Sequence, residues 1–309
     1  MSADPVDPGA APAGGRPHQP DEASPPHQPD TAEGRPHQPD TAGWSRRRSV
    51  RSRAPIALLI PAWVGLAFLV LPLIGLVGRT PWGSLGERLA DPAVFAALKL
   101  SLFTATVATV ACLVFGVPLA WLLARVPFRG RRVVRALVTV PLVLPPVVGG
   151  VALFLALGRR GLVGSFIYEH TGFSLPFTTA GVIVAEAFVA MPFLVISVEG
   201  ALRAADTRFE EAAATLGAGS WTTFRRVTLP LVAPGVAAGA VLCWARALGE
   251  FGATITFAGN FPGRTQTMPL AVYLALETDP AAAIVLSLVL LAVCVAILAL
   301  LRERWVGAL

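Results

Sequence analysis

The chain has 309 residues, of which 54% are hydrophobic and only 14% are charged. A soluble domain carries about 25% charged residues, so most of this chain is expected to lie in a membrane. The net charge of +6 does not indicate a nucleic-acid partner, because the basic residues gather in alternate loops between apolar segments. The three cysteines, Cys112, Cys243 and Cys294, fall inside apolar segments, so no disulfide is predicted.

Residues 1–53 are rich in Pro, Asp, Ala and Gly and nearly free of large apolar side chains. We predict a disordered cytoplasmic tail. The tetrapeptide His-Gln-Pro-Asp occurs three times, at His18, His27 and His37, and we interpret it as low-complexity sequence rather than a metal site. The basic run Arg46-Arg47-Arg48 comes before the first apolar segment, which favours a cytoplasmic N-terminus and argues against a cleavable signal peptide.

Six segments are apolar over about 20 residues, the length of a helix that spans a bilayer. They cover residues 55–78, 94–124, 133–157, 179–202, 231–255 and 281–301. The sequence therefore predicts an all-α integral membrane domain over 54–309 with six transmembrane helices. The arginines between the segments favour both termini in the cytoplasm, because they concentrate in three stretches: 125–132, 203–230 and 302–309.

A polar, helix-prone stretch separates the fourth and fifth apolar segments. Thr207 and Glu210 match a capping box at a helix start, and Gly217 suits a left-handed helix end. Four residues between them share one helical face: Phe209, Ala212, Ala213 and Leu216. Such a helix can lie on the membrane surface, or its small alanines can seat it in a groove on a soluble partner.

A second short helix is predicted to begin at Ser220. It would carry Trp221 and Phe224 on one side. We expect it to end near Leu229-Pro230, because proline lacks a backbone donor and does not easily continue a helix.

One spacing pattern resembles the EAA loop of ABC importer permeases: Glu211-Ala212-Ala213, then Gly217, then Val227, Leu229 and Pro230. Valine stands at position 227, where isoleucine is commonest in that loop. We call residues 203–230 the EAA segment. The resemblance implies the type I ABC importer permease fold and a segment that couples the chain to a separate ATPase. The residues implied in that contact are Phe209, Glu211, Ala212, Ala213, Leu216, Gly217, Leu229 and Pro230.

The sequence contains no phosphate loop of the form G-x-x-x-x-G-K-[ST]. We therefore expect no enzyme activity and no cofactor in this chain. ATP and Mg²⁺ would be bound by the partner ATPase subunit.

A second motif runs from Arg246-Ala247-Leu248-Gly249-Glu250-Phe251-Gly252 through Ala258-Gly259-Asn260 to Arg264-Thr265-Gln266-Thr267-Met268-Pro269. It resembles the molybdate branch of the oxyanion permeases. The resemblance implies a permease subunit that moves molybdate by alternating access. It also implies a homodimer in the lipid of the cytoplasmic membrane, two ATPase subunits and an extracytoplasmic binding protein that delivers molybdate.

The second motif contains charged and polar side chains with two possible roles. Arg246 and Glu250 are four positions apart on the predicted fifth helix, so they can form an ion pair that locks the helix or can line the pathway. The outer donors Asn260, Arg264, Thr265 and Thr267 would meet either the oxyanion or the binding protein. We favour the binding protein, because a transport path should not hold its cargo tightly.

Two glutamates lie in the fourth apolar segment, Glu186 and Glu199. A carboxylate would repel a dianion, so we interpret both as structural or lipid-interface residues.

Other functions remain as alternatives. The cargo could be sulfate, thiosulfate or tungstate. A secondary transporter driven by an ion gradient would instead require inverted repeats and discontinuous helices, and it would leave the EAA segment unexplained. A membrane enzyme is less favoured, because no catalytic constellation is visible.

Overall fold

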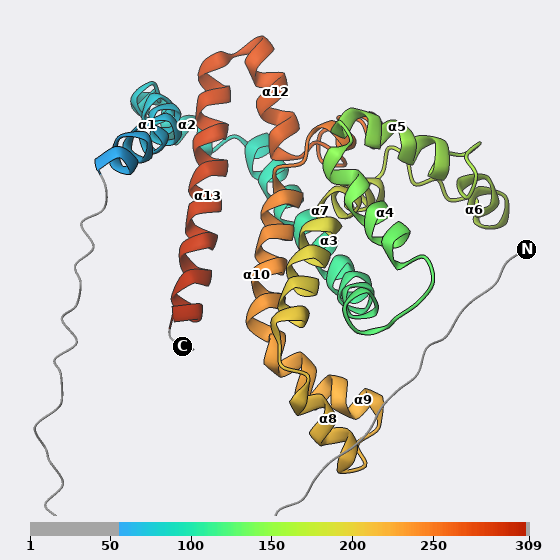
Figure 1. Cartoon of the computed structure of the whole chain (residues 1–309). Coiled ribbons are helices and arrows are strands. Elements are labelled where there is room, and N and C mark those ends of the chain that lie inside the picture. The colour runs from blue at the N-terminus through green and yellow to red at the C-terminus, as the bar shows by residue number, and fades with distance from the viewer. Residues whose placement is uncertain (1–55, 307–309) are drawn as a thin grey trace, which may run out of the picture. The chain divides into compact units, whose positions relative to one another are not determined.

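The computed structural model describes residues 56–306 (Figure 1). The predicted disordered tail, residues 1–53 with its His-Gln-Pro-Asp repeats, lies outside the described residues. All regular elements between 56 and 306 are helical, so the predicted all-α class is confirmed.

Five helices are long and apolar enough to cross a membrane. They are α1 (Ile56–Gly78), α3 (Pro92–Arg125), α7 (Thr179–Ala204), α10 (Leu229–Leu248) and α13 (Pro280–Val306). Their positions confirm five of the predicted segments. The predicted end of the fifth at residue 255 is wrong, because α10 stops at Leu248 and a separate short helix, α11 (Gly252–Phe257), follows a break.

The third predicted segment, 133–157, is not one straight helix. It consists of α4 (Arg131–Val143) and α5 (Pro146–Leu157), which meet at an angle of 120°. Pro145 and Pro146 lack backbone donors, and Leu144 before them takes an extended conformation with ψ at 131°. If the pair counts as one broken span, the described residues contain six spans. Without the pair they contain five.

The core lies between α3, α7 and α10, which all contact one another. Many of its buried side chains are small, among them Ala105, Ala108 and Ala190. Gly239 of α10 permits a close approach, since a Cβ atom there would lie 3.0 Å from Cβ of Ser197 in α7. Small residues let helices pack tightly in lipid, where the hydrophobic effect does not drive helices together.

Both glutamates of α7 bond inside the protein. Glu199 Oε1 accepts from Nη2 of Arg135 at 2.7 Å and from Nη2 of Arg203 at 2.6 Å, which joins α4 to α7. Glu186 is 1% exposed and accepts a hydrogen bond from Thr104 of α3 at 2.9 Å. The structural reading of these residues is confirmed, and neither side chain faces lipid. The cysteines are free thiols, as predicted.

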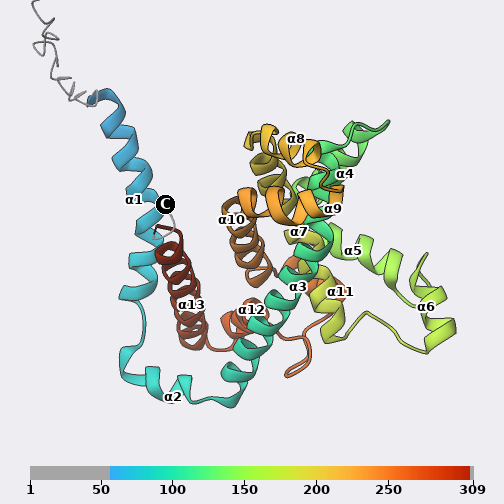
Figure 2. The ribbon, with the colours of Figure 1, turned by 90° about the horizontal axis from the view of Figure 1, so that it is seen from below.

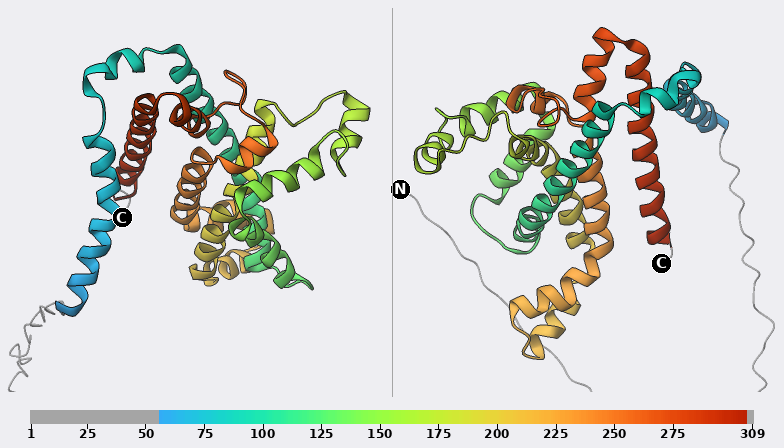
Figure 3. Two further views of the ribbon diagram at one scale, coloured as in Figure 1. Left: turned by 90° about the horizontal axis from the view of Figure 1, so that it is seen from above. Right: turned by 180° about the vertical axis from the view of Figure 1, so that it is seen from behind.

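The long helices α3, α7, α10 and α13 connect two opposite ends of the bundle, whereas α1 lies across α13 (Figures 1 and 2). The helices α3, α7 and α13 run toward the end that carries α8 (Arg208–Thr215) and α9 (Ser220–Thr223), whereas α10 runs away from it (Figures 1 and 3). Figure 2 shows α1 beside α13, which it contacts. The predicted basic loops 125–132 and 203–230 therefore lie at the same end.

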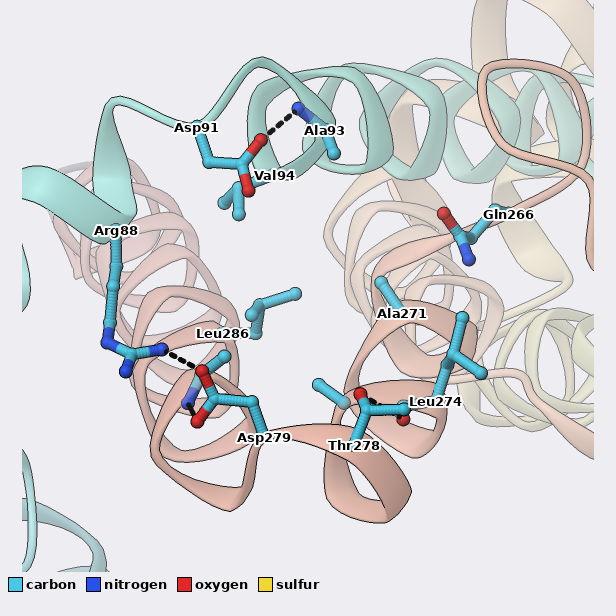
Figure 4. Close-up of a pocket in the computed structure, with 12 residues that line it drawn as sticks. Arg88, Asp91, Ala93, Val94, Gln266, Ala271, Leu274, Thr278, Asp279 and Leu286 are labelled. Atoms are coloured by element: carbon cyan, nitrogen blue, oxygen red, sulfur yellow. Dashed lines mark hydrogen bonds and ion pairs between the residues drawn. The ribbon is translucent and has the colours of Figure 1, made fainter.

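Short helices that the sequence did not reveal occupy the other end. They are η1 (Trp82–Ser84), α2 (Leu85–Leu89), α6 (Gly164–Thr171) and α12 (Met268–Thr278). Arg88 of α2 donates to Asp279 Oδ2 at 2.6 Å, and this pair lines a pocket of about 260 Å³ (Figure 4). Asp279 Oδ1 accepts from the amides of Ala281 and Ala282, so the same residue caps α13.

The contact between α5 and α11 depends on the absence of a side chain at Gly150. A Cβ atom there would lie 2.8 Å from the carbonyl oxygen of Ala253 and would collide with the Thr256 side chain. We expect Gly150→Ala to destabilise the protein by about 1–3 kcal/mol through overpacking. Thermal unfolding in detergent measures this loss. Gly75→Ala is the control, since no atom lies within 4 Å of a Cβ at Gly75; equal melting temperatures for both variants would contradict the tight contact.

Candidate functional site

Helix α8 presents its predicted apolar face to the outside. Phe209 is 58% exposed and Leu216 is 88% exposed, although both are large and apolar. Ala212 is also exposed, and Ala213 is half-buried. Within residues 56–306 nothing covers this face, which is the property that a docking helix requires.

The predicted capping box at the start of α8 is wrong. Thr207 has helical angles, φ −70° and ψ −16°, and its side chain makes no cap bond. Asp206 Oδ1 accepts from the amide of Arg208 at 3.0 Å instead. Glu210 points into the protein, where its Oε1 accepts from Nη2 of Arg125 and from Oγ1 of Thr228, both at 3.0 Å. A guanidinium in a partly buried site is a stronger partner than the amide that a capping box would supply.

The end of α8 follows the prediction. Gly217 has a φ of 82°, in the left-handed region. The amide of Ala218 donates to the carbonyl of Ala213 and that of Gly217 to Ala214, each at 3.0 Å. These two bonds form a Schellman motif, which fixes the turn after the helix.

The second helix of the EAA segment does not end at Leu229-Pro230, contrary to the prediction. The turn η2 (Phe224–Thr228) is a π-helix, and it joins α9 to α10 in a continuous helix of 29 residues, Ser220–Leu248. The amide of Leu229 donates to the carbonyl of Phe224, five residues back. This wider turn lies directly before Pro230, which has no backbone donor, so the helix continues through the proline.

Aromatic rings fasten the start of this continuous helix to α3. Phe224 stacks on Trp221, with ring centroids 5.8 Å apart, and meets Trp121 of α3 edge-on at 6.1 Å. Together with Pro118 they line an apolar pocket of about 300 Å³. Trp221 is 72% exposed, so α9 also presents a large apolar side chain to the outside.

At the opposite end, Arg246 and Glu250 form the predicted ion pair, with Nη2 and Oε2 2.6 Å apart. The two are not on one helix as predicted, since α10 ends at Leu248 and Gly249 interrupts it. Glu250 is buried, and its Oε1 accepts from the amide of Ala253 at 2.8 Å, at the start of α11. The pair therefore fixes the break between α10 and α11.

The four outer donors separate into buried and exposed groups. Thr265 and Thr267 are at most 1% exposed, and Thr265 Oγ1 accepts from the amide of Phe261 at 2.9 Å. Asn260 is half-buried, and Arg264 is exposed. The structure brings Arg264 into one pocket with Arg159 and Arg160, two arginines that no sequence motif indicated as site residues. Arg159 and Arg160 lie far from Arg264 in the sequence, so no short motif could indicate that the three share a pocket.

The comparisons with known proteins agree with this architecture. The family model "binding-protein-dependent transport system inner membrane component" matches residues 116–307. The chain is 49% identical over 239 residues to the molybdenum transport system permease protein ModB of Mycobacterium tuberculosis, covering 77% of this chain and 90% of the relative. ModB of Escherichia coli is 41% identical, covering 71% and 95%. The sulfate transport system permease protein CysT of Escherichia coli is 38% identical, covering 72% and 82%.

Solved structures share the fold at lower identity. A bacterial ABC transporter that imports the acidic polysaccharide alginate matches with a TM-score of 0.67 at 19% identity, covering 81% of this chain and 94% of that one. The MetNI methionine ABC transporter, in an inward-facing form, matches with a TM-score of 0.57 at 20% identity, covering 70% and 96%. The predicted type I ABC importer permease fold is confirmed. The chain belongs to the family of binding-protein-dependent transport system inner membrane components.

Proposed function

We propose that this chain is the membrane subunit of an ATP-driven molybdate importer and that it moves the oxyanion by alternating access. The observation that carries this proposal is the 49% identity to a molybdenum permease over 77% of the chain, against 38% to a sulfate permease. Sulfate is therefore the weaker alternative. Tungstate is nearly isosteric with molybdate and belongs to the same proposal.

ATP hydrolysis belongs to a separate subunit in this proposal. The relatives are permeases rather than enzymes, and a second copy of the chain with two ATPases completes the transporter, with ATP and Mg²⁺ held by the ATPases. α1 has no buried residue in its most apolar stretch, which leaves its surface free for lipid or for the second copy.

The EAA segment is the contact with the ATPase. The exposed Phe209 and Leu216 enter a groove on that subunit, with Glu211, Ala212, Ala213 and Gly217 beside them. Leu229 and Pro230 lie where η2 passes into α10, so they transmit the movement rather than touch the partner. Because α9, η2 and α10 form one helix, a displacement of the segment reaches the other end of the bundle. The step that depends on ligand then requires a difference in ligand affinity between the two states.

The arrangement of arginines supports one orientation of the chain in the membrane. The EAA end carries Arg125, Arg131, Arg203 and Arg208, which favours the cytoplasm under the positive-inside rule. The basic stretches before the first and after the last apolar segment support the proposal that both termini are cytoplasmic. The opposite end, with Asn260 and Arg264, would face the extracytoplasmic binding protein. Thr265, Thr267, Arg246 and Glu250 would then support this surface or line the pathway from within.

Uptake of labelled molybdate into vesicles tests the function. The vesicles contain the chain and its ATPase, and molybdate-loaded binding protein is added. We expect uptake that requires ATP, resists excess sulfate and is competed by tungstate. Uptake abolished by sulfate would assign the chain to sulfate transport, and uptake that follows an ion gradient without ATP would contradict the ABC mechanism.

The contact with the ATPase is tested at Glu211 and Gly217. Glu211→Lys reverses an exposed charge, and Gly217→Pro imposes a negative φ where the chain has 82°. We expect both variants to insert into the membrane but to lose uptake by about tenfold or more, because a displaced helix no longer engages the partner. ATP hydrolysis and uptake are measured together. Normal uptake by both variants would remove the basis for this contact.

Glu210 is expected to have a different role from its neighbour. Glu210→Ala leaves Arg125 and Thr228 without their shared acceptor, and both are largely buried. We expect the free energy of unfolding to fall by about 1–3 kcal/mol. The melting temperature should fall, and coupling should weaken because α8 is no longer tied to α3 and η2. Glu211→Ala is the matched control, since Glu211 is exposed and should leave the melting temperature unchanged. Equal melting temperatures for the two alanine variants would contradict this role.

A further inference from the structure

Three arginines converge in a large pocket at the end opposite the EAA segment. The pocket has a volume of about 700 Å³ and is lined by Arg159 and Arg160 after α5, by Arg264, and by Phe173 and Phe177 before α7. Three separate stretches of the chain thus build one concave, positively charged surface.

These arginines have no carboxylate partner in the part of the chain that the structure describes. Arg88, Arg125, Arg135, Arg203 and Arg246 each lie within 4.0 Å of an acidic oxygen there, and no such pair involves the pocket arginines. All three are exposed at their own side chains. Like charges that gather in a concave site concentrate a positive potential, which attracts an anionic partner.

Aromatic packing holds the pocket in shape. The guanidinium carbon of Arg159 lies 5.1 Å from the centre of the Tyr168 ring. Phe177 contacts Phe154 and Phe261 edge-on, with centroids 6.2 Å and 6.1 Å apart. Its φ of 62° is the one positive value among non-glycine residues in 56–306. Backbone strain of this kind is kept where the surroundings enforce it, often at functional sites.

The size and lining of the pocket indicate whether it suits a small ion or part of a protein. A single tetrahedral oxyanion would leave most of a 700 Å³ pocket empty and would gain nothing from its phenylalanine walls. Exposed phenylalanines beside arginines are instead the composition of protein–protein contacts, in which aromatic and arginine side chains dominate the binding energy. Phe173 and Phe177 are 47% and 46% exposed, so a partner can reach them.

We propose that this arginine pocket receives a protruding acidic loop of the extracytoplasmic binding protein, whose carboxylates pair with Arg159, Arg160 and Arg264. The inference rests on the proposed function, because it assigns a docking position to a partner which that function requires. A complex of the structurally similar alginate transporter with its periplasmic protein is consistent with such a partner in this fold. The pocket borders α5 and the loop after α11, so docking acts directly on the two elements that Gly150 holds together.

The test uses the full chain with its ATPase in proteoliposomes, titrated with molybdate-loaded binding protein. For Arg159→Glu combined with Arg160→Glu, the binding-protein concentration that half-maximally stimulates ATP hydrolysis should rise by about tenfold or more. Added salt should raise that concentration for the wild type, because salt screens the attraction. It should lower that concentration for the variant, because salt screens the repulsion between the new glutamates and the acidic loop. A lysine substitution in an acidic loop of the binding protein should restore stimulation of the variant selectively.

Arg79→Glu is the matched control, since Arg79 is an exposed arginine of the same end that does not line the pocket. Co-purification with the ATPase verifies that each variant is folded. An unchanged half-maximal concentration in the double variant would overturn the inference. If maximal uptake were lost at that unchanged concentration, the arginines would lie on the oxyanion path instead. A changed oligomeric state would assign the pocket to the second copy. Failure of the wild type to import molybdate would refute the proposed function instead.

Discussion

The need to bond every backbone group without water determines this structure. In a bilayer a chain meets that need with helices, and it breaks a helix only where other parts of the protein cover the break. The described residues contain two breaks in apolar segments, at Pro145-Pro146 and at Gly249, and the chain after the second break packs against the first. Pro145, Pro146 and Gly249 are exposed in the single chain, so their cover has to come from outside it. A Cβ on Gly252, at the start of α11, would lie 2.7 Å from Cβ of Pro146. Glu250 closes the second break by accepting from the amide of Ala253 while it pairs with Arg246.

The two ends of the bundle carry different candidate contact surfaces. At one end Glu210 ties the exposed helix α8 to α3 and η2, so the apolar surface offered to a partner is mounted on the membrane helices. At the other end the broken segments carry the arginine pocket. Because α9, η2 and α10 form one continuous helix from Ser220 to Leu248, a single element connects the two ends. This connection is what an importer needs if ATP on one side is to act on cargo from the other.

Local patterns predicted the features that local forces control. Apolar length predicted the positions of five spanning helices, although the fifth ends at Leu248 rather than at 255. The glycine at 217 predicted the left-handed end of α8. The capping box failed because Glu210 had a better partner 85 positions away, in Arg125. The predicted helix end at Pro230 was wrong because the helix continues through a π-helical turn directly before the proline. The third segment is bent rather than straight, because two adjacent prolines allow an angle that no periodicity encodes.

The sequence by itself determined the membrane class, the helix positions, the EAA segment and the resemblance to oxyanion permeases, since each depends on composition or on spacing within a short stretch. The tertiary structure alone decided which side chains meet: Arg246 with a Glu250 that lies beyond its helix, and Arg264 with two arginines more than a hundred positions earlier. The physical reason is that contacts across a bundle depend on how bent helices pack, and that packing is a property of the whole chain rather than of any segment.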